Sequence, residues 1–280
     1  MLAAIDWSRP WFAGFADDGR RLAARLQQGA SAAQALNDCL DAACDAGQVR
    51  NGAGLPLRFV TQQELPEGRA YEAHIFATGK VPTRDNLHDI FNGLVWLRFP
   101  RAKAMLNRLQ AEAIAADGVQ GRRGPVRDAA TLFDENGAIF LFRDARAEAQ
   151  LRAFDWRALF VQERGDWHAG RTVLPFGHAL LEKLAAPYKS LTAHAWTLPF
   201  PLAADDPGEP AVDQALAHGL AAARDGEALH GRAFAPLPVL GIPGWCDANA
   251  EPSFYDDAAV FRPGRRAAQA WSGDAGRHWC

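Results

Sequence analysis

Hydrophobic residues along most of the chain recur three and four positions apart, which is the spacing of an amphipathic α-helix. In the N-terminal part, Ser31 can cap a helix, and Gly47 can end it. The apolar face of that helix carries Leu36, Cys39 and Leu40. We therefore expect the first 50 residues to form a helical pair. The pattern predicts further helices at 71–78, 86–98 and 125–136, after Pro100, and near 144–164, 176–186 and 210–224.

Strands are predicted to be few and short. Residues 55–60 and 138–142 are short apolar runs, and residues 191–198 alternate between apolar and polar side chains. Gly137 suits a left-handed helix end before the second of these runs. From Phe234 onward Pro and Gly are frequent, which predicts irregular structure wrapped over the core. The expected fold class is therefore α+β, dominated by helices.

One globular domain is predicted for the whole chain, because 280 residues with 49% hydrophobic composition can bury a large core and no composition shift divides it. Its predicted parts are the helical pair at 1–50, a core at 51–265 and a tail at 266–280.

Charge and composition exclude several classes of partner. The chain carries 30 Lys and Arg against 33 Asp and Glu, so no overall positive charge favours nucleic acid or an anionic membrane. No apolar stretch reaches the roughly 18 residues of a membrane-spanning helix, and no N-terminal export signal is evident. The four cysteines include no C-x-x-C pair, so a zinc ribbon is not indicated. We expect a cytoplasmic protein that can bind a small-molecule ligand, and the sequence identifies no protein partner.

The segment VPTRDNLHDIFNGLVWLRFP, residues 81–100, predicts a helix that is buried nearly all round. Asp85 or Asn86 can cap it. Its polar exceptions fall on one narrow stripe at helical spacing: Asp85, His88 and Asn92, with Asp89 beside them. Buried polar groups need partners, so this stripe is the first candidate for a functional site.

Histidines elsewhere in the chain can join this stripe. His178 and Glu182 lie four residues apart on a predicted helix, so they project from one face, and His194 follows on a predicted strand. Imidazole and carboxylate groups together can hold a divalent Zn, Mn or Fe ion and leave a position for water. The predicted metal ligands are His88, His178, Glu182 and His194.

Metal-free acid–base chemistry is the alternative use of these residues. Asp85 or Asp89 would then orient His88 as in a catalytic dyad. The block FDENGA, residues 133–138, superficially resembles the nucleophile loop of haloacid-dehalogenase-like phosphatases, with Asp134 as nucleophile, but a helix is predicted where that fold needs a buried strand. The predicted catalytic residues are His88, Asp89, Asn92, Asp134 and Glu135.

Substrate binding is assigned to basic and aromatic residues. Arg127 lies in the first turn of a predicted helix, close to Arg122 and Arg123, and arginines there can bind phosphate or carboxylate. A solvated basic loop is the alternative. Trp245 lies in an aromatic, Pro- and Gly-rich loop that could roof a pocket, although such loops more often pack over the core. The predicted substrate-binding residues are Arg84, Arg127 and Trp245.

Three blocks, PTRDNLHDIFNGLVWLRFP, RGPVRDAATLFDENGA and LPVLGIPGW, resemble an uncharacterised proteobacterial family, the domain of unknown function 3025. The likeness spans about residues 55–263. It implies membership of the family and carries over no activity.

The leading prediction is a hydrolase that acts on a small anionic substrate, with or without a divalent metal. The competing prediction is a non-enzymatic ligand-binding or scaffold protein, whose His, Asp and Asn groups stiffen the core through a hydrogen-bond network. Convergence of His88, His178 and His194 at a pocket open to solvent would favour the enzyme.

Overall fold

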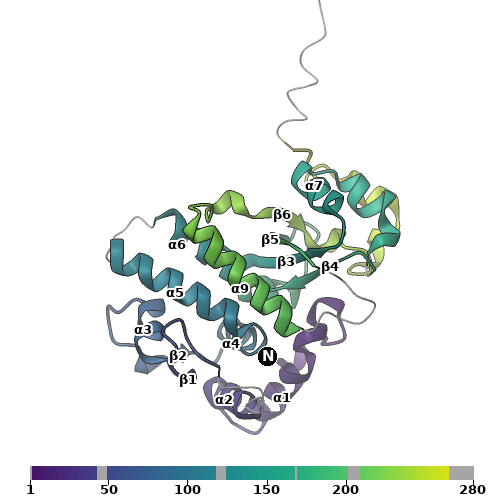
Figure 1. Cartoon of the computed structure of the whole chain (residues 1–280). Helices are drawn as coiled ribbons and strands as arrows, with labels where there is room; N and C mark the ends of the chain where they lie inside the picture. Colours follow the sequence, from purple (N-terminus) through teal and green to yellow (C-terminus); the bar gives the residue numbers. More distant parts are fainter. Residues whose placement is uncertain (1, 43–48, 118–123, 168, 201–208, 265–280) are drawn as a thin grey trace, which may run out of the picture.

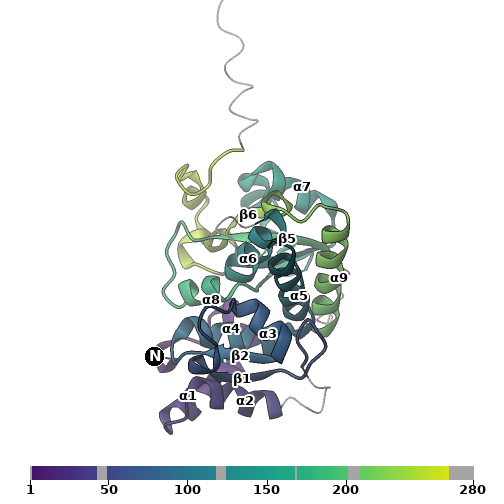
Figure 2. The same ribbon diagram turned by 90° about the vertical axis from the view of Figure 1, so that its left-hand side faces the viewer.

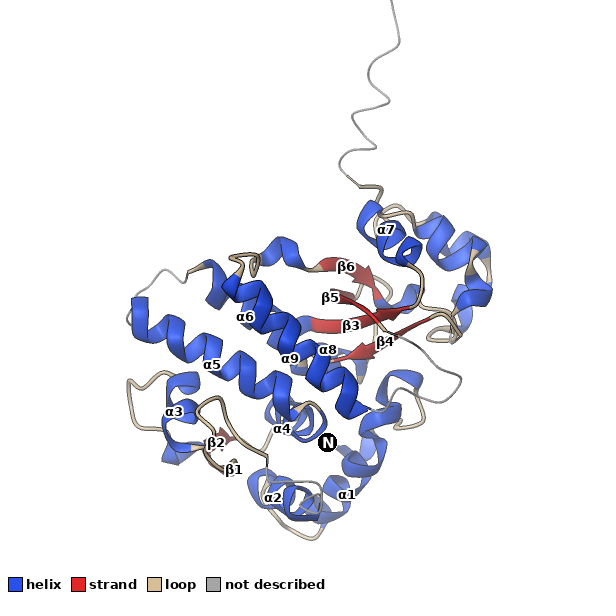
Figure 3. Ribbon diagram, in the orientation of Figure 1, coloured by secondary structure: helices blue, strands red, loops and turns tan. Residues whose placement is uncertain are grey.

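Helices dominate the structure, a computed structural model that describes residues 2–42, 49–117, 124–167, 169–200 and 209–264 (Figure 1). Short strands form two small sheets (Figure 3). The predicted helix-dominated α+β class is confirmed. The helices are α1 (Ala16–Gln27), α2 (Ala32–Ala42), α3 (Tyr71–Thr78), α4 (Leu87–Arg98), α5 (Pro100–Asp117), α6 (Pro125–Asn136), α7 (Ala145–Ala153), α8 (His178–Leu184) and α9 (Glu209–Asp225). The strands are β1 (Arg58–Thr61), β2 (Lys80–Thr83), β3 (Gly137–Phe142), β4 (Arg171–Pro175), β5 (Thr192–Pro199) and β6 (Ala235–Pro238).

The larger sheet has the strand order β4, β3, β5, β6. Its central strand β3 runs parallel to β5 and antiparallel to β4, and β6 pairs antiparallel with β5. All residues of β3, GAIFLF, are buried, so both of its faces are covered. A strand covered on both faces needs a continuous apolar run, which is the pattern that predicted it. The smaller sheet is the parallel pair β1 and β2.

Helix α5 lies between the larger sheet and the N-terminal helices, and it packs against α9, α6 and α3 (Figure 2). Helix α4 packs against α8, α2 and α5, and its residues 89–96 are all buried, as its apolar pattern predicts. Gly93 lets α2 come close, because a Cβ atom at this position would lie 2.4 Å from Cδ1 of Leu36. Within the described residues, no helix has both the length and the apolar character to cross a membrane.

The start of α2 is fixed by side-chain caps. The backbone N–H of Gln34 donates to Oγ of Ser31 at 3.2 Å, and Oε1 of Gln34 accepts from the N–H of Ser31 at 2.9 Å. This reciprocal capping box confirms the predicted cap. Asp85 also serves α2, since its Oδ1 accepts from the N–H of Ala32 at 2.7 Å. Helix α4 is instead capped by Asn86, which accepts from a first-turn N–H at 2.8 Å.

Several local predictions were wrong or incomplete. Gly137 is not left-handed: its φ is −74°, and it starts β3 directly. Glycine is needed there for space, because a Cβ atom would lie 2.3 Å from the carbonyl oxygen of Phe133. A left-handed glycine is found at the end of α3 instead, where Gly79 has a φ of 72°. Strands β2 and β4 were not predicted, and β6 lies in the region expected to be irregular. The predicted helix end at Gly47 falls outside the described residues.

Candidate functional site

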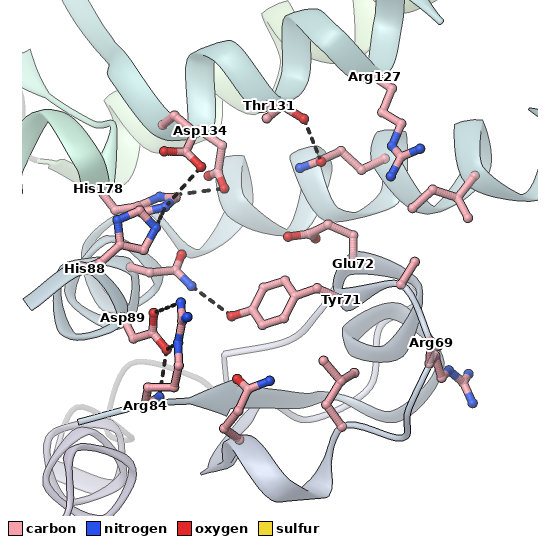
Figure 4. A pocket seen from close by; sticks show the side chains of 18 residues that line it. Arg69, Tyr71, Glu72, Arg84, His88, Asp89, Arg127, Thr131, Asp134 and His178 are labelled. Carbon is pink, nitrogen blue, oxygen red and sulfur yellow. Dashed lines mark hydrogen bonds and ion pairs between the residues drawn. The ribbon is translucent and has the colours of Figure 1, made fainter. Parts of the chain in front are cut away.

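A cavity of about 660 Å³ opens among helices α3, α4, α5, α6 and α8 (Figure 4). Most of the polar residues singled out in the sequence line it, although they come from three separate stretches of chain. The predicted site residues that line the cavity are Arg84, His88, Asp89, Asn92, Arg127, Asp134, Glu135 and His178.

The close approach of α8 to the end of α6 places His178. Gly177 precedes α8, and its N–H donates to the carbonyl oxygen of Gly137 at 2.8 Å. A Cβ atom at Gly177 would lie 2.4 Å from the carbonyl oxygen of Glu135, so only glycine lets the two backbones meet. The first residue of α8 is therefore held beside Asp134 and Glu135. His88 reaches the same point from the first turn of α4.

Two histidines and a carboxylate converge at this point. Nε2 of His88 lies 3.0 Å from Nε2 of His178, with the two rings at 80° to each other. Oε1 of Glu135 lies 3.9 Å from Nε2 of His178. One ligand atom from each of these three residues falls within 4.8 Å of the others, and within the described residues this is the only such group of three. The cluster can hold one metal ion.

A carboxylate stands behind each imidazole. Nδ1 of His88 lies 3.1 Å from Oε2 of Glu182, within hydrogen-bond distance. Nδ1 of His178 lies 3.8 Å from Oδ2 of Asp134. Histidine ligands of metals commonly donate their second ring N–H to a carboxylate, which fixes the tautomer and leaves the other nitrogen free to bind. The His88 ring has this form, whereas Nδ1 of His178 is buried without a hydrogen-bond partner among the described residues.

The pKa of His178 is lowered from 6.5 to about 4, chiefly by burial; Asp134 opposes this shift, and Lys103 and His88 add to it. The ring is therefore neutral at physiological pH. Neutral imidazole is the form that binds a metal ion, so no proton has to be displaced from His178 first.

A buried network lies beneath the cluster. The ammonium of Lys103, which is 3% exposed, donates to Oδ1 of Asp134 at 2.5 Å and to Oδ1 of Asn92 at 2.8 Å. Nδ2 of Asn92 then donates to the hydroxyl of Tyr71 at 3.1 Å. Burial alone would raise the pKa of Asp134, but Lys103 and His178 hold it below its usual value. Asp134 thus stays ionised behind His178, while Asn92 connects Lys103 to the cavity wall.

Sequence reasoning missed Lys103, Tyr71 and Glu72. Glu72 is half-buried in the cavity wall, where its Oε2 accepts from Nδ2 of Asn107 at 2.8 Å. Burial raises the pKa of Glu72, and the nearby Lys103 only partly opposes this. A signal was present: Lys103, Asn107 and Gln110 follow the four- and three-residue spacing of a helix face, and all three are buried.

The prediction that Asp85 or Asp89 orients His88 was wrong. Both oxygens of Asp89 are taken by Arg84, whose Nε and Nη2 donate at 3.0 and 2.9 Å and whose backbone N–H donates at 2.7 Å. Asp85 caps α2 instead. Glu182 contacts Nδ1 of His88 instead and does not belong to the group of three that could hold a metal ion.

Two further predicted site residues lie elsewhere. His194 sits on β5 opposite Gly137, outside the cavity lining and outside the metal-ligand group, because the strand that carries it belongs to the larger sheet. Burial, aided by Lys183, lowers its pKa. Trp245 is buried with its ring 5.6 Å from that of Trp11 and does not line the cavity, so the packing alternative holds for its loop.

The likeness to the dehalogenase-type nucleophile loop also fails. Asp134 lies in the last turn of α6, whereas that loop must follow a buried strand.

Of the predicted basic cluster, Arg122 and Arg123 fall outside the described residues. Arg127 lines the cavity, and its side chain is half-buried there.

Comparison with known proteins shows the family of the chain. No curated protein and no solved structure matches the chain. The family model described as "Protein of unknown function (DUF3025)" matches residues 57–265, a range that contains every residue lining the cavity. The chain therefore belongs to this family of proteins of unknown function.

Proposed function

We propose that the chain is a metal-dependent hydrolase of a small anionic substrate, with His88, His178 and Glu135 as the metal ligands. One observation carries the proposal: the two Nε2 atoms face each other at 3.0 Å, while Nδ1 of His88 lies 3.1 Å from Oε2 of Glu182. Two nitrogens on one tetrahedral ion, each at about 2.05 Å, lie about 3.3 Å apart. The pair is close to that arrangement without rebuilding the site.

The donor set fits zinc, manganese or iron. Two imidazoles and one carboxylate suit these borderline ions, and three protein ligands leave coordination positions for water and substrate. When bound, such an ion lowers the pKa of a coordinated water and polarises a carbonyl or phosphoryl oxygen. Hydrolysis then adds the oxygen and one hydrogen of water to the acyl or phosphoryl centre, and the other hydrogen leaves with the displaced group.

The surrounding residues would hold this site in a single protonation state. Glu182 accepts from Nδ1–H of His88, so Nε2 of that ring carries the free lone pair. Lys103 keeps Asp134 ionised behind His178. These groups act by orienting the imidazoles, and they need not touch the substrate.

The charge of the cavity supports an anionic substrate. Three arginines in the lining and Lys103 beneath it stand against four lining carboxylates and Glu182 beside His88, so a divalent ion makes the sum positive. This positive charge favours an anion in the same cavity. The arginines are Arg69, Arg84 and Arg127, and the carboxylates are Glu72, Asp89, Asp134 and Glu135.

Elemental analysis of untagged protein, purified without chelator, tests the proposal. We expect about one zinc, manganese or iron ion per chain in the wild type and in the His194→Ala control, and loss of that ion in His178→Ala. The control matters because His194 was the third predicted histidine ligand and lies outside the cluster. Absence of metal from every variant, also after incubation with zinc, would remove the hypothesis.

The competing function, a non-enzymatic binding or scaffold protein, is favoured by the continuity of the Lys103, Asp134, Asn92 and Tyr71 contacts. A satisfied buried network of this kind can simply stiffen a core. The same variants separate the two functions. A scaffold protein would lose stability in His178→Ala, but its wild type would contain no metal.

A further inference from the structure

We propose that the hydroxyl group of Tyr71 donates a hydrogen bond to the carbonyl or phosphoryl oxygen of the substrate while water adds to that group. Tyr71 is then a catalytic residue, and Asn92 and Lys103 are positioning residues that turn its hydrogen toward the ligand. The role in hydrolysis rests on the proposed function, whereas the direction of the hydrogen follows from the hydrogen bonds alone.

Lys103 fixes the direction of the hydrogen bonds beneath the histidine cluster. An ammonium group has only donors, so the atom of Asn92 that lies 2.8 Å from Nζ of Lys103 has to be the oxygen Oδ1. The amide nitrogen Nδ2 of Asn92 then points the other way and lies 3.1 Å from the hydroxyl oxygen of Tyr71. Tyr71 therefore accepts this hydrogen bond, and its own hydrogen points away from Asn92.

The hydrogen of Tyr71 is available to a ligand. Tyr71 lines the cavity, and within the described residues no acceptor is bonded to its hydrogen. Figure 4 shows its hydroxyl on the side of His88 and Asp89, away from Arg69. Tyr255 differs, because its hydroxyl donates to the carbonyl oxygen of Gly241 at 2.8 Å. A half-buried hydroxyl whose hydrogen has no acceptor in the fold can donate to a molecule in the cavity.

The position of Asn92 brings this hydroxyl close to the histidine cluster. Asn92 follows His88 by four residues on α4, so the two side chains project from one face, about 6 Å apart along the helix axis. The Tyr71 hydroxyl is bonded to Asn92 and lies on the same side of the cavity. A substrate oxygen placed between Asn92 and His88 would therefore meet the hydrogen of Tyr71.

The charge of Lys103 strengthens this donor. Hydrogen bonds in series polarise one another, so the ammonium makes Asn92 a better donor, and Asn92 does the same for Tyr71. An oriented donor of this kind stabilises the negative charge that develops on the substrate oxygen. Burial raises the pKa of Tyr71 well above 10, and Glu72 adds to the shift, so the hydroxyl keeps its proton throughout the step.

Titration of inorganic phosphate into the zinc-loaded full chain, followed by calorimetry, tests the inference. We expect the Kd for phosphate to rise at least about tenfold in Tyr71→Phe, because one hydrogen bond to an anion is lost. The Kd for zinc should stay unchanged, since Tyr71 is not one of the three ligands. Tyr188→Phe is the matched control, because Tyr188 is 52% exposed and does not line the cavity.

Asn92→Asp tests the direction of the hydrogen. The carboxylate would keep the contact with Lys103 and accept from Tyr71, which turns the hydroxyl hydrogen away from the cavity. We expect weaker phosphate binding, with a much smaller effect when the substitution is made in Tyr71→Phe. A pure charge effect of the carboxylate would be equal in both backgrounds.

Carbon-13 NMR of the tyrosine Cζ atoms gives a second measurement if a variant fails to fold. The chain has three tyrosines, so Tyr188→Phe and Tyr255→Phe assign the remaining resonance to Tyr71. Phosphate should shift the Tyr71 resonance and leave the other two in place. An unmoved Tyr71 resonance in the presence of bound phosphate would contradict the inference.

The metal site and the role of Tyr71 fail by different results. Equal phosphate Kd values in the wild type and Tyr71→Phe, with zinc bound to both, would overturn the role of Tyr71 and leave the metal site in place. Failure of the wild type to take up zinc would remove the hydrolase. Titration of phosphate into the zinc-free chain then decides the donor: weaker binding in Tyr71→Phe supports it, and equal or absent binding overturns it.

Discussion

Lys103 is the buried cation on which the site depends. Its ammonium lies 5.4 Å from the ring centre of Trp96, and it donates to Asp134 and Asn92. A lysine with 3% exposure is stable in its charged form only because these groups surround it. The position on α5 appears in the sequence as one polar residue among apolar neighbours, whereas its partners come from α4 and α6.

Replacing Lys103 with Met would leave the Asp134 carboxylate buried without its partner. We expect Lys103→Met to lower the free energy of unfolding by about 3–5 kcal/mol, measured by urea denaturation. The double variant with Asp134→Leu should recover part of that loss, because no buried charge remains. Arg108→Met, which breaks an exposed pair with Glu112 on the same helix, should change stability little. A small effect of Lys103→Met would contradict the role given to this network.

Glu72 predicts a pH dependence of stability. Burial raises its pKa above the unfolded value of 4.5, so the folded state binds this proton more tightly than the unfolded chain does. The contribution is favourable below the unfolded pKa and is lost as pH rises through the folded pKa. Glu72→Gln removes the cost of ionisation, so it should stabilise the protein at pH 7.5 and have no such effect near pH 4. Urea denaturation at both pH values measures this, and equal effects at both would show that ionisation of Glu72 is not the cause.

At the scale of elements, the site depends on how closely α8 approaches the end of α6. A Cβ atom at Gly177 would lie 2.4 Å, 2.5 Å and 2.6 Å from backbone atoms of Glu135, Gly137 and Asn136. Backbone atoms in this position cannot move aside as a flexible side chain can. The φ of Gly177 is −63°, so space and not conformation requires glycine.

Gly177→Ala should therefore push α8 away from α6 and separate His178 from Glu135. We expect a loss of about 1–3 kcal/mol in stability and a weaker zinc affinity, measured by titration of chelator-treated protein. Gly165→Ala is the control, because a Cβ atom there meets open space. Unchanged zinc affinity in Gly177→Ala would argue against Glu135 and His178 sharing an ion.

The elements themselves were largely predictable, because their caps and periodicities are local. The apolar circumference of α4 and the Ser31 cap were both visible in the sequence. The short strands β2 and β4 were not, since strands of four or five residues depend on neighbours that only the folded chain supplies.

At the scale of the molecule, the sequence identified eight of the 18 residues that line the cavity, but not which residues meet. His88 and His178 are 90 positions apart, and their contact depends on the packing of α4 against α8. His194 was placed with them because strand alternation predicts a face but not the strand's position in a sheet. Glu135, and not the predicted Glu182, belongs to the group of three around His88 and His178 for a similar reason: the predicted helix gives a direction for each side chain, not the helix it faces.

The hydrogen bond from Ala32 to Asp85 connects the start of α2 to the segment that leads into α4. Helix α2 lies before the family-matched range of 57–265, yet Leu36 fills the groove at Gly93, and Phe12 stacks on Phe91 at 5.8 Å. A fragment cut to the matched range would present the apolar back of α4 to water, a surface prone to self-association. The N-terminal segment thus supports α4, the helix that carries His88. The unit that folds together therefore extends beyond the residues that the family model matches.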